Sequence, residues 1–134
     1  MIVVDASYFI DALVGSEERA RAALDVLLVE PDVGAPDFVD AEVANGLRGQ
    51  WLGHRISNAE LATAMEVFGH LAVVRHPSRL LVHRALMLRQ NATAYDGCYI
   101  SLAESLEVPL YTADAKLKRV PGIRCEVRVL GEAA

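Results

Sequence analysis

The apolar positions of the chain alternate between short β-branched runs and longer stretches with the spacing of a helix. Ile2-Val3-Val4 is a short apolar run of the kind that forms a buried parallel strand. Similar runs predict further strands within 31–36, at 71–74, from Leu110 and at 125–130. Between them, apolar residues recur at helical spacing and predict helices over 6–14, 37–52, 57–69 and 78–90, and two more that begin at Ser16 and Thr93.

The stretch from Thr93 to Asp114 sets the organisation of the rest. It predicts a helix with Asp96 in its first turn, a break at Val108-Pro109, a short strand, and Asp114 just past that strand. The apolar face of the helix is formed by Tyr99, Leu102, Ala103 and Leu106. Because such a helix runs antiparallel to the strand that follows it, we expect the two acids to meet at one edge of a sheet.

The alternation of strands and helices with short connections predicts an α/β fold. We expect a mainly parallel sheet of roughly five strands with helices on both faces, in three layers and in one domain over 1–134. Ligands of such sheets bind beyond the carboxyl ends of the strands. Asp5 follows the first strand, Glu42 begins the helix after the second, and Asp96 and Asp114 flank the fourth. The topology therefore brings all four carboxylates to the same edge.

Each of these acids also has a purely structural interpretation. Thr93 and Asp96 fit the capping-box pattern, and Asp5 and Asp114 could each cap the helix that follows. Glu42 would be a favourable charge near a helix N-terminus. Taken singly, each acid is explained by capping. Capping does not explain why all four residues are carboxylates, because Ser, Thr and Asn cap helices as well.

Composition narrows the class of protein. The chain has 134 residues, is 53% hydrophobic and carries a net charge of −5, so it has enough apolar residues for a core. Its acidity argues against coating nucleic acid by bulk electrostatics, but not against cutting it at a local site. Two cysteines without a disulfide-rich pattern, no signal-peptide pattern and no apolar stretch that could span a bilayer predict a cytoplasmic protein without membrane association.

Four clustered carboxylates call for a cation. Two such charges about 4 Å apart repel by about 4 kcal/mol at an effective dielectric constant near 20. All-oxygen ligation selects Mg²⁺ or Mn²⁺, and the four histidines show no close pairing on a helix, which argues against zinc. A metal ion at this edge would activate water and neutralise the charge of a phosphodiester.

These residues resemble a family. The segments that carry the likeness are Val3-Val-Asp5-Ala-Ser7, Glu42-Val-Ala-Asn45-Gly-Leu47-Arg48, Ala94-Tyr-Asp96 and Tyr111-Thr-Ala-Asp114. In this order and spacing they resemble the PIN domain, most closely the VapC-type toxins of toxin–antitoxin pairs. No single motif is specific, but the ordered set covers essentially the whole chain.

The resemblance implies a Mg²⁺- or Mn²⁺-dependent endoribonuclease that cleaves with activated water and no covalent intermediate. Its catalytic acids would be Asp5, Glu42, Asp96 and Asp114, with Asp5, Asp96 and Asp114 as metal ligands. Ser7, Thr112 and Asn45 would support them. It also implies inhibition by a small VapB-type antitoxin and assembly as a homodimer, in which Trp51 is a candidate interface residue. Lys116 stands where many members carry a further acid, so the number of metal ions, one or two, stays open.

The RNA itself, whether tRNA, rRNA or mRNA, cannot be read from the residues. Arg75, Arg79 and Arg84 lie in a segment of concentrated positive charge and are predicted to line the approach of the RNA. The alternative interpretation of this segment is a solvated helix face.

Three other functions compete with this one. A phosphorylatable receiver domain is also a small α/β protein with acids at strand ends, but it needs adjacent acids after its first strand, and here Asp5 stands alone. A haloacid-dehalogenase-like phosphatase would need a second aspartate where Ser7 stands. The remaining alternative is a catalytically silent PIN-type module that only binds partners.

Overall fold

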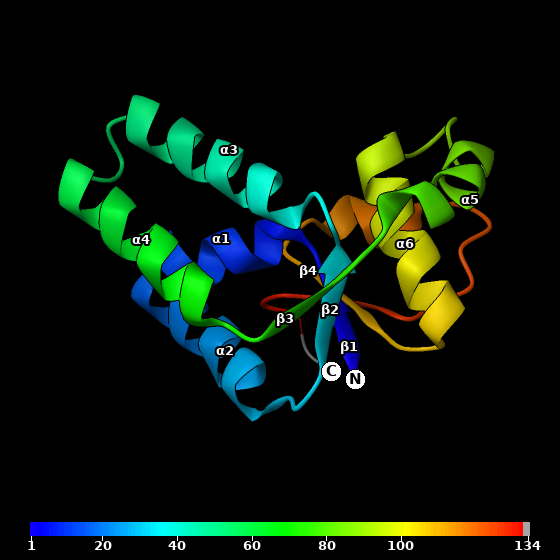
Figure 1. The fold of residues 1–134 in the computed structure, drawn as a ribbon, viewed down its shortest axis with the longest axis horizontal. Coiled ribbons are helices and arrows are strands. Elements are labelled where there is room, and N and C mark those ends of the chain that lie inside the picture. The colour runs from blue at the N-terminus through cyan, green and yellow to red at the C-terminus, as the bar shows by residue number, and fades with distance from the viewer. Residues whose placement is uncertain (133–134) are drawn as a thin grey trace.

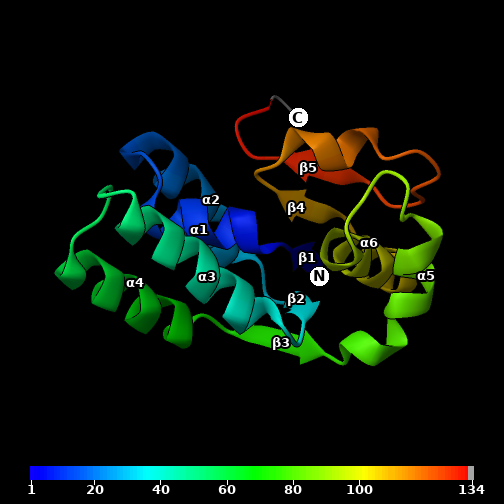
Figure 2. The ribbon, with the colours of Figure 1, turned by 90° about the horizontal axis from the view of Figure 1, so that it is seen from above.

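A five-stranded, wholly parallel sheet forms the centre of the molecule in a computed structural model that describes residues 1–132. The strands are β1 (Ile2–Val4), β2 (Val33–Pro36), β3 (Val73–His76), β4 (Leu110–Thr112) and β5 (Val127–Val129). They lie in the order β3-β2-β1-β4-β5; Figure 1 shows β1 beside β2, and Figure 2 shows the whole order. The predicted parallel sheet is confirmed, and β1, which has a neighbour on each side, is its central strand.

Helices cover both faces of this sheet, as Figure 2 shows. The helices α1 to α4 lie on one side, and α5 and α6 lie on the other. Their bounds are α1 Ala6–Val14, α2 Glu17–Val29, α3 Val39–Leu52, α4 Asn58–His70, α5 Val82–Met87 and α6 Ala94–Leu106, with short 3₁₀ helices η1 at Ser78–Leu80 and η2 at Ala115–Arg119. Among the described residues, no helix is both long and apolar enough to cross a bilayer.

The burial of β1 explains its sequence. Ile2, Val3 and Val4 are all buried, since helices cover both faces of the strand and neighbours pair with both of its edges. Val3 pairs with Gly34 of β2 and with Leu110 of β4. A strand enclosed in this way must be apolar at every position, not only at alternate ones. The first polar residue after it, Asp5, is therefore carried to the carboxyl edge of the sheet.

Local capping brings polar groups to the same edge. The carboxylate of Asp5 accepts the backbone N–H of Tyr8 at 3.1 Å, and the Thr93 hydroxyl accepts that of Asp96 at 3.1 Å. The carboxylate of Asp114 accepts the N–H of Lys116 at 2.9 Å and begins η2. Asp5 and Asp114 thus do cap helices, while Asp96 sits in the first turn of α6 without capping it.

The structure corrects three predicted boundaries. The third strand lies at Val73–His76 and not at 71–74, because α4 extends to His70 and residues 73–76 are the ones that pair with β2. The last strand is shorter than 125–130. The single helix predicted over 78–90 is wrong, since η1 and α5 are separate helices that meet at Leu81.

The reason for this break lies in burial. Leu81, Ala85 and Leu88, the predicted apolar stripe, are all buried as expected. The turn at Leu81 lets the stripe follow the core, whereas Leu80 just before it stays 72% exposed. The apolar spacing therefore predicts the buried stripe correctly, but it does not require a continuous helix.

A glycine allows α5 and α6 to lie close together. A Cβ atom added at Gly97 would lie 2.8 Å from both Cα and Cβ of Ala85, which is closer than non-bonded carbons approach. Gly97 follows Asp96, so this close packing also fixes where the first turn of α6 stands against α5. Gly49, by contrast, lies in α3 with nothing within 4 Å of an added Cβ.

We predict opposite effects of the same substitution at these two glycines. Gly49→Ala should raise the free energy of unfolding by about 0.5–1 kcal/mol, since alanine favours a helix interior. Gly97→Ala gains the same propensity but overpacks against Ala85, a cost of about 1–3 kcal/mol, so its net effect should be destabilising. Urea unfolding of both variants measures this. A Gly97→Ala protein as stable as Gly49→Ala would show that the two helices can separate freely.

Candidate active site at the carboxyl edge

Asp5 is the most enclosed acid of the molecule's carboxyl edge, with 4% of its surface exposed. Its Oδ1 accepts the Ser7 hydroxyl at 2.6 Å as well as the backbone N–H of Tyr8. Its Oδ2 accepts the Thr112 hydroxyl at 2.5 Å. Both oxygens are therefore held in place by donors, two from α1 and one from β4, and the carboxylate cannot turn without breaking these hydrogen bonds.

The two hydroxyl groups extend this network to the segment that holds Asp114. The Ser7 hydroxyl accepts the backbone N–H of Ala113 at 3.0 Å, and the Thr112 hydroxyl accepts that of Asp114 at 3.0 Å. The ends of β1 and β4 are thus tied together through side chains as well as through the ladder. Asp114 is consequently placed relative to Asp5 by a continuous set of hydrogen bonds.

Glu42 enters the site from α3 and is oriented by a tyrosine of α6. The hydroxyl of Tyr99 donates to Oε1 of Glu42 at 2.8 Å. The Tyr99 ring itself is 1% exposed and packs edge-to-face on Phe38, with ring centroids 5.6 Å apart. The hydroxyl is thus fixed by the core, and it leaves Oε2 of Glu42 available to another group.

Asp96 and Asp114 line one cleft of about 460 Å³, together with Arg89, Thr93 and Lys116. The side chain of Lys116 forms no ion pair or hydrogen bond with any residue in 1–132. Within residues 1–132, the guanidinium of Arg89 donates only to the carbonyl of Leu86, at 3.0 Å. This cleft therefore combines two acids with two cations that do not neutralise them.

The electrostatics show that the four acids form one cluster with Asp96 at its centre. Burial raises the pKa of Asp5 to about 6, against the lowering effect of its hydrogen bonds, and the charge of Asp96 raises it further. Burial also raises the pKa of Glu42, with Asp96 adding to the effect. The pKa of Asp96 is raised by burial and then by the charge of Asp114. Asp96 is thus close enough to Asp5 and Glu42, and Asp114 close enough to Asp96, for the neighbouring charge to raise these three pKa values.

The donors of this cluster fit a hard divalent cation. No three carboxylate, histidine or cysteine side chains within 1–132 are grouped closely enough to form a complete ligand set by themselves. Mg²⁺ does not require one, since it keeps several of its waters and is usually held by one or two carboxylates. Enclosed, mutually repelling carboxylates without a neutralising side chain are the environment that such an ion stabilises.

The structure brings together most, but not all, of the site residues predicted from the sequence. The four acids share one edge, and Ser7 and Thr112 both bind Asp5. Asn45 is exposed on α3, and no hydrogen bond joins its side chain to the rest of the described chain. Their roles in catalysis stay predictions.

The three arginines proposed for RNA binding are not equivalent. Arg75 forms a two-pronged pair with Asp40, at 2.8 and 2.7 Å. Arg84 is bound to Glu104 in the last turn of α6, at the opposite end of that helix from Asp96. Arg79 is exposed. Two of the three charges are therefore already matched within the protein, and the role of all three in binding RNA stays a prediction.

The site also contains Tyr99, Arg89 and Lys116, to which the sequence pattern assigns no role there. Helical spacing places Tyr99 on an apolar helix face and cannot assign a function to its hydroxyl. A usable signal existed, because Tyr99 is three residues after Asp96 and so shares its side of α6. Lys116 was noted only as the replacement for an acid.

The chain is similar to known proteins over most of its length. The PIN domain family matches residues 2–123 of the chain. Ribonuclease VapC1 of Mycobacterium tuberculosis is 39% identical over 129 residues, which cover 96% of each chain.

Solved structures share the fold. The crystal structure of VapC20 of Mycobacterium tuberculosis, a toxin that cleaves the sarcin–ricin loop, superposes with a TM-score of 0.67 at 16% identity and covers 92% of this chain and 97% of its own. VapBC2 of Rickettsia felis, crystallised with a DNA fragment from its promoter, gives a TM-score of 0.64 at 17% identity over 95% of this chain and 98% of its own.

The raised pKa of Asp5 predicts how Asp5→Asn changes stability with pH. The pKa is about 6 in the folded protein and 3.8 when unperturbed, so ionisation disfavours the folded state as the pH rises from about 4 to 6. The shift corresponds to a penalty on the order of 3 kcal/mol, which is absent below pH 4 and complete above pH 6. In EDTA, the unfolding free energy of Asp5→Asn minus that of the parent should therefore increase across this range.

Denaturant unfolding at several pH values measures this difference. Asp25→Asn, which removes an exposed carboxylate on α2, controls for the change in net charge. A difference that stays constant from pH 4 to 7 would mean that Asp5 is solvated and does not resist ionisation.

Proposed function

The chain belongs to the PIN-domain family and is a VapC-type member of it, and from this premise we propose that it is the ribonuclease toxin of a toxin–antitoxin pair. The observation that carries the proposal is the cluster of four coupled carboxylates at the carboxyl edge, with Asp5 buried and held at both oxygens. A cap needs one acceptor, whereas an enclosed group of repelling acids stores energy that a bound cation releases. The name of VapC1 supports the same activity.

We propose Mg²⁺ or Mn²⁺ as the cation, with Asp5, Asp96 and Asp114 around it, one or two of them bound to the ion directly and the rest through its waters. When bound, the ion would neutralise charge on the phosphodiester and acidify the attacking water. The support for this assignment is the all-oxygen donor set and the raised pKa values of Asp5 and Asp96.

The residues of the chain divide the remaining work. Ser7 and Thr112 keep the carboxylate of Asp5 oriented, so that it does not have to reorient in each catalytic cycle. Tyr99 holds Glu42 by Oε1, and Oε2 can accept a proton from the water as its oxygen bonds to phosphorus and the P–O bond to the leaving oxygen breaks. The raised pKa of Glu42, caused first by burial, makes it a stronger base than an exposed glutamate.

Lys116 and Arg89 provide positive charge beside the acids. They share the cleft with Asp96 and Asp114, and no carboxylate in the described chain pairs with either of them. An acidic protein that binds RNA must hold phosphates through such local cations, since its net charge of −5 repels the strand as a whole. We therefore place the phosphates that flank the cleaved bond along this rim.

The solved structures support a proposal about partners. VapBC2 of Rickettsia felis has the same fold, which supports an antitoxin of the VapB type as the partner that blocks this site. We further propose a cytoplasmic homodimer, with Trp51, 40% exposed at the end of α3, as a candidate contact.

The strand order argues against the receiver domain. Receiver domains have the order 2-1-3-4-5, whereas this sheet has β3-β2-β1-β4-β5. β3 also ends at the exposed edge of the sheet without an acid that could be phosphorylated. The catalytically silent PIN module is the remaining alternative. RNA cleavage by the purified parent protein would exclude it, and absence of cleavage in Mn²⁺ would favour it.

Removing the central acid should abolish cleavage. Asp96→Asn should reduce the rate of RNA cleavage in Mn²⁺ by at least about 10²-fold, because it removes a proposed ligand whose charge acts on both Asp5 and Glu42. The assay uses a mixed RNA pool with Mn²⁺ or EDTA, and Asp25→Asn as the matched control. Near-parental cleavage by folded Asp96→Asn would contradict the assignment.

Metal binding can be measured without cleavage. A cation at a hundredfold excess over its dissociation constant should stabilise the parent by about 2.7 kcal/mol, and Asp96→Asn far less. Melting curves with EDTA and with Mn²⁺ give both values. Equal shifts in the two proteins would place the ion elsewhere.

The basic rim has its own signature in the salt dependence of RNA binding. In the Asp96→Asn background, Lys116→Gln should reduce the slope of log K against log[salt] by about 0.7, as expected for one lost phosphate contact to a single strand. Arg21→Gln, which removes an exposed cation from α2, is the control and should leave the slope unchanged. Fluorescence anisotropy with a labelled oligoribonucleotide measures both slopes. If the two variants behaved alike, Lys116 would not contact phosphate.

A further inference from the structure

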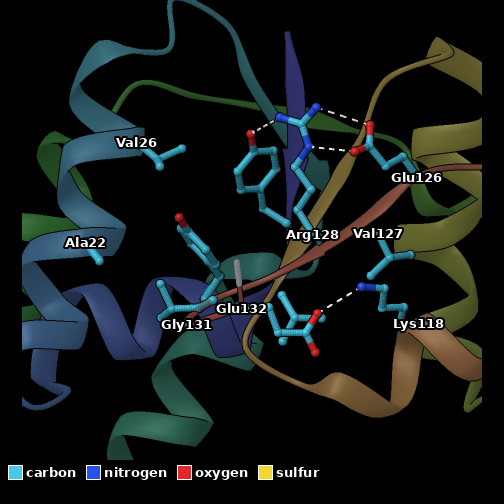
Figure 3. A pocket seen from close by; sticks show the side chains of 12 residues that line it. Ala22, Val26, Lys118, Glu126, Val127, Arg128, Gly131 and Glu132 are labelled. Atoms are coloured by element: carbon cyan, nitrogen blue, oxygen red, sulfur yellow. Dashed lines mark hydrogen bonds and ion pairs between the residues drawn. The ribbon is translucent and has the colours of Figure 1, made fainter. Parts of the chain in front are cut away.

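A pocket of about 660 Å³ lies between α2 and the edge strand β5, away from the cleft of the acids. Figure 3 shows Ala22 and Val26 of α2 facing Val127 and Arg128 across it. We call it the β5 pocket. Its volume is in the usual range of ligand sites, about 300–1,000 Å³. The function proposed above gives it no role.

The floor of the β5 pocket is aromatic. Tyr8 and Tyr111 meet there edge-to-face, with ring centroids 5.8 Å apart and ring planes at 90°. Tyr8 is 2% exposed, and burial raises its pKa to about 12, with Tyr111 contributing, so its hydroxyl stays protonated at neutral pH. The floor therefore offers ring surface together with a neutral hydroxyl that can both donate and accept.

The Tyr8 hydroxyl has no hydrogen-bond partner within residues 1–132. No side-chain nitrogen or oxygen that is wholly enclosed in the described structure lacks a partner, so this hydroxyl must open onto the β5 pocket. A ligand with only apolar atoms would leave it unpaired at a cost of about 1–3 kcal/mol. The pocket is thus built for a flat group with a polar edge.

The charges at the rim are balanced. Arg128 donates to Glu126 at 2.9 and 3.2 Å and to the hydroxyl of Tyr111 at 2.7 Å, and Lys118 pairs with Glu132 at 2.9 Å (Figure 3). Two cations and two anions leave no net charge, which does not favour a phosphate. The guanidinium of Arg128 lies 5.5 Å from the centroid of the Tyr111 ring and offers a second flat surface.

The position of the β5 pocket connects it to the acid cluster. Tyr8 follows Ser7 and Tyr111 precedes Thr112, the two residues that hold Asp5. The Lys118–Glu132 pair lies beyond the carboxyl ends of β4 and β5, on the same edge as Asp114. An RNA strand bound across the four acids can therefore extend toward the β5 pocket along the same edge of the sheet.

We propose that the β5 pocket binds one unstacked nucleobase of the RNA and so sets the base preference near the cleaved bond. Single-stranded RNA is recognised in this way, by stacking of splayed-out bases on aromatic rings and guanidinium planes and by hydrogen bonds to their edges. The hydroxyl of Tyr8 and the carboxylates of Glu126 and Glu132 supply the edge contacts. The proposal rests on the proposed ribonuclease function in one respect, namely that the bound base belongs to an RNA strand.

The direct test uses nucleosides, which carry the base without phosphate. Adenosine, guanosine, cytidine and uridine are titrated into ¹⁵N-labelled protein up to millimolar concentration. At least one of them should shift the amide signals of Val127, Val129 and Gly131. Ala22→Trp, which fills the pocket from α2, should abolish these shifts, and Leu28→Trp, at a 73% exposed position of the same helix, should keep them.

The hydroxyl is tested separately. Tyr8→Phe keeps the buried ring and removes no hydrogen bond within the described chain, so it should fold like the parent and bind the nucleoside about threefold to tenfold more weakly. If no nucleoside shifts these signals, or if Ala22→Trp leaves the shifts unchanged, the proposal is wrong. Neither result depends on catalysis, so this failure is distinct from failure of the ribonuclease proposal.

A second arm separates RNA from a protein occupant. Cleavage sites are mapped in a random RNA pool with the parent, Ala22→Trp and Leu28→Trp. Loss of base preference at one fixed position in Ala22→Trp alone supports the proposal. An unchanged preference, together with weaker binding of the antitoxin by Ala22→Trp, would assign the β5 pocket to the antitoxin and overturn it.

Discussion

The carboxylate of Asp5 is the constraint on which the rest of the site depends. It is a charged group at the end of the central strand, almost completely enclosed, and it is held by donors that come from two parts of the chain. The hydroxyl of Thr112 reaches it only because β1 and β4 are neighbours in register, with Val4 opposite Tyr111. The geometry of the site is therefore a direct consequence of one strand pairing.

Around this carboxylate the protein gathers charge that it does not neutralise. Asp96 acts on both Asp5 and Glu42, and Asp114 acts on Asp96, while Lys116 and Arg89 lie in the same cleft without pairing with them. Elsewhere the molecule does pair its charges, as Arg84 with Glu104 and Arg75 with Asp40 show. The contrast indicates that the carboxyl edge sacrifices stability for binding, which is a common cost of functional sites.

The two segments that hold Asp5 also face a second space. Ser7 and Thr112 point to the acid, whereas Tyr8 and Tyr111, next to them in sequence, line the β5 pocket. In β4 this follows from the pleat, since successive side chains of a strand point to opposite faces. A ligand in the β5 pocket would therefore press on the same short segments that position the carboxylate.

The sequence by itself determined the structural features that depend on residues close together along the chain. The apolar run of β1, the buried stripe of Leu81, Ala85 and Leu88, and the caps at Asp5, Thr93 and Asp114 all follow from periodicity and local hydrogen bonding. The alternation of strands and helices then brought the four acids to one edge, because parallel strands share the direction of their carboxyl ends. These features need only a few consecutive residues to be specified.

Tertiary structure alone decided what depends on contacts between distant residues. The third strand begins at Val73 because residues 73–76 are the ones that pair with β2. The apolar run at 71–74 contains no information about this pairing. Tyr99 orients Glu42 across 57 positions of sequence, and Arg84 finds Glu104 across 20. Such pairings are set by how the helices pack on the sheet, since the free energy of each depends on burial and distance, which no local pattern contains.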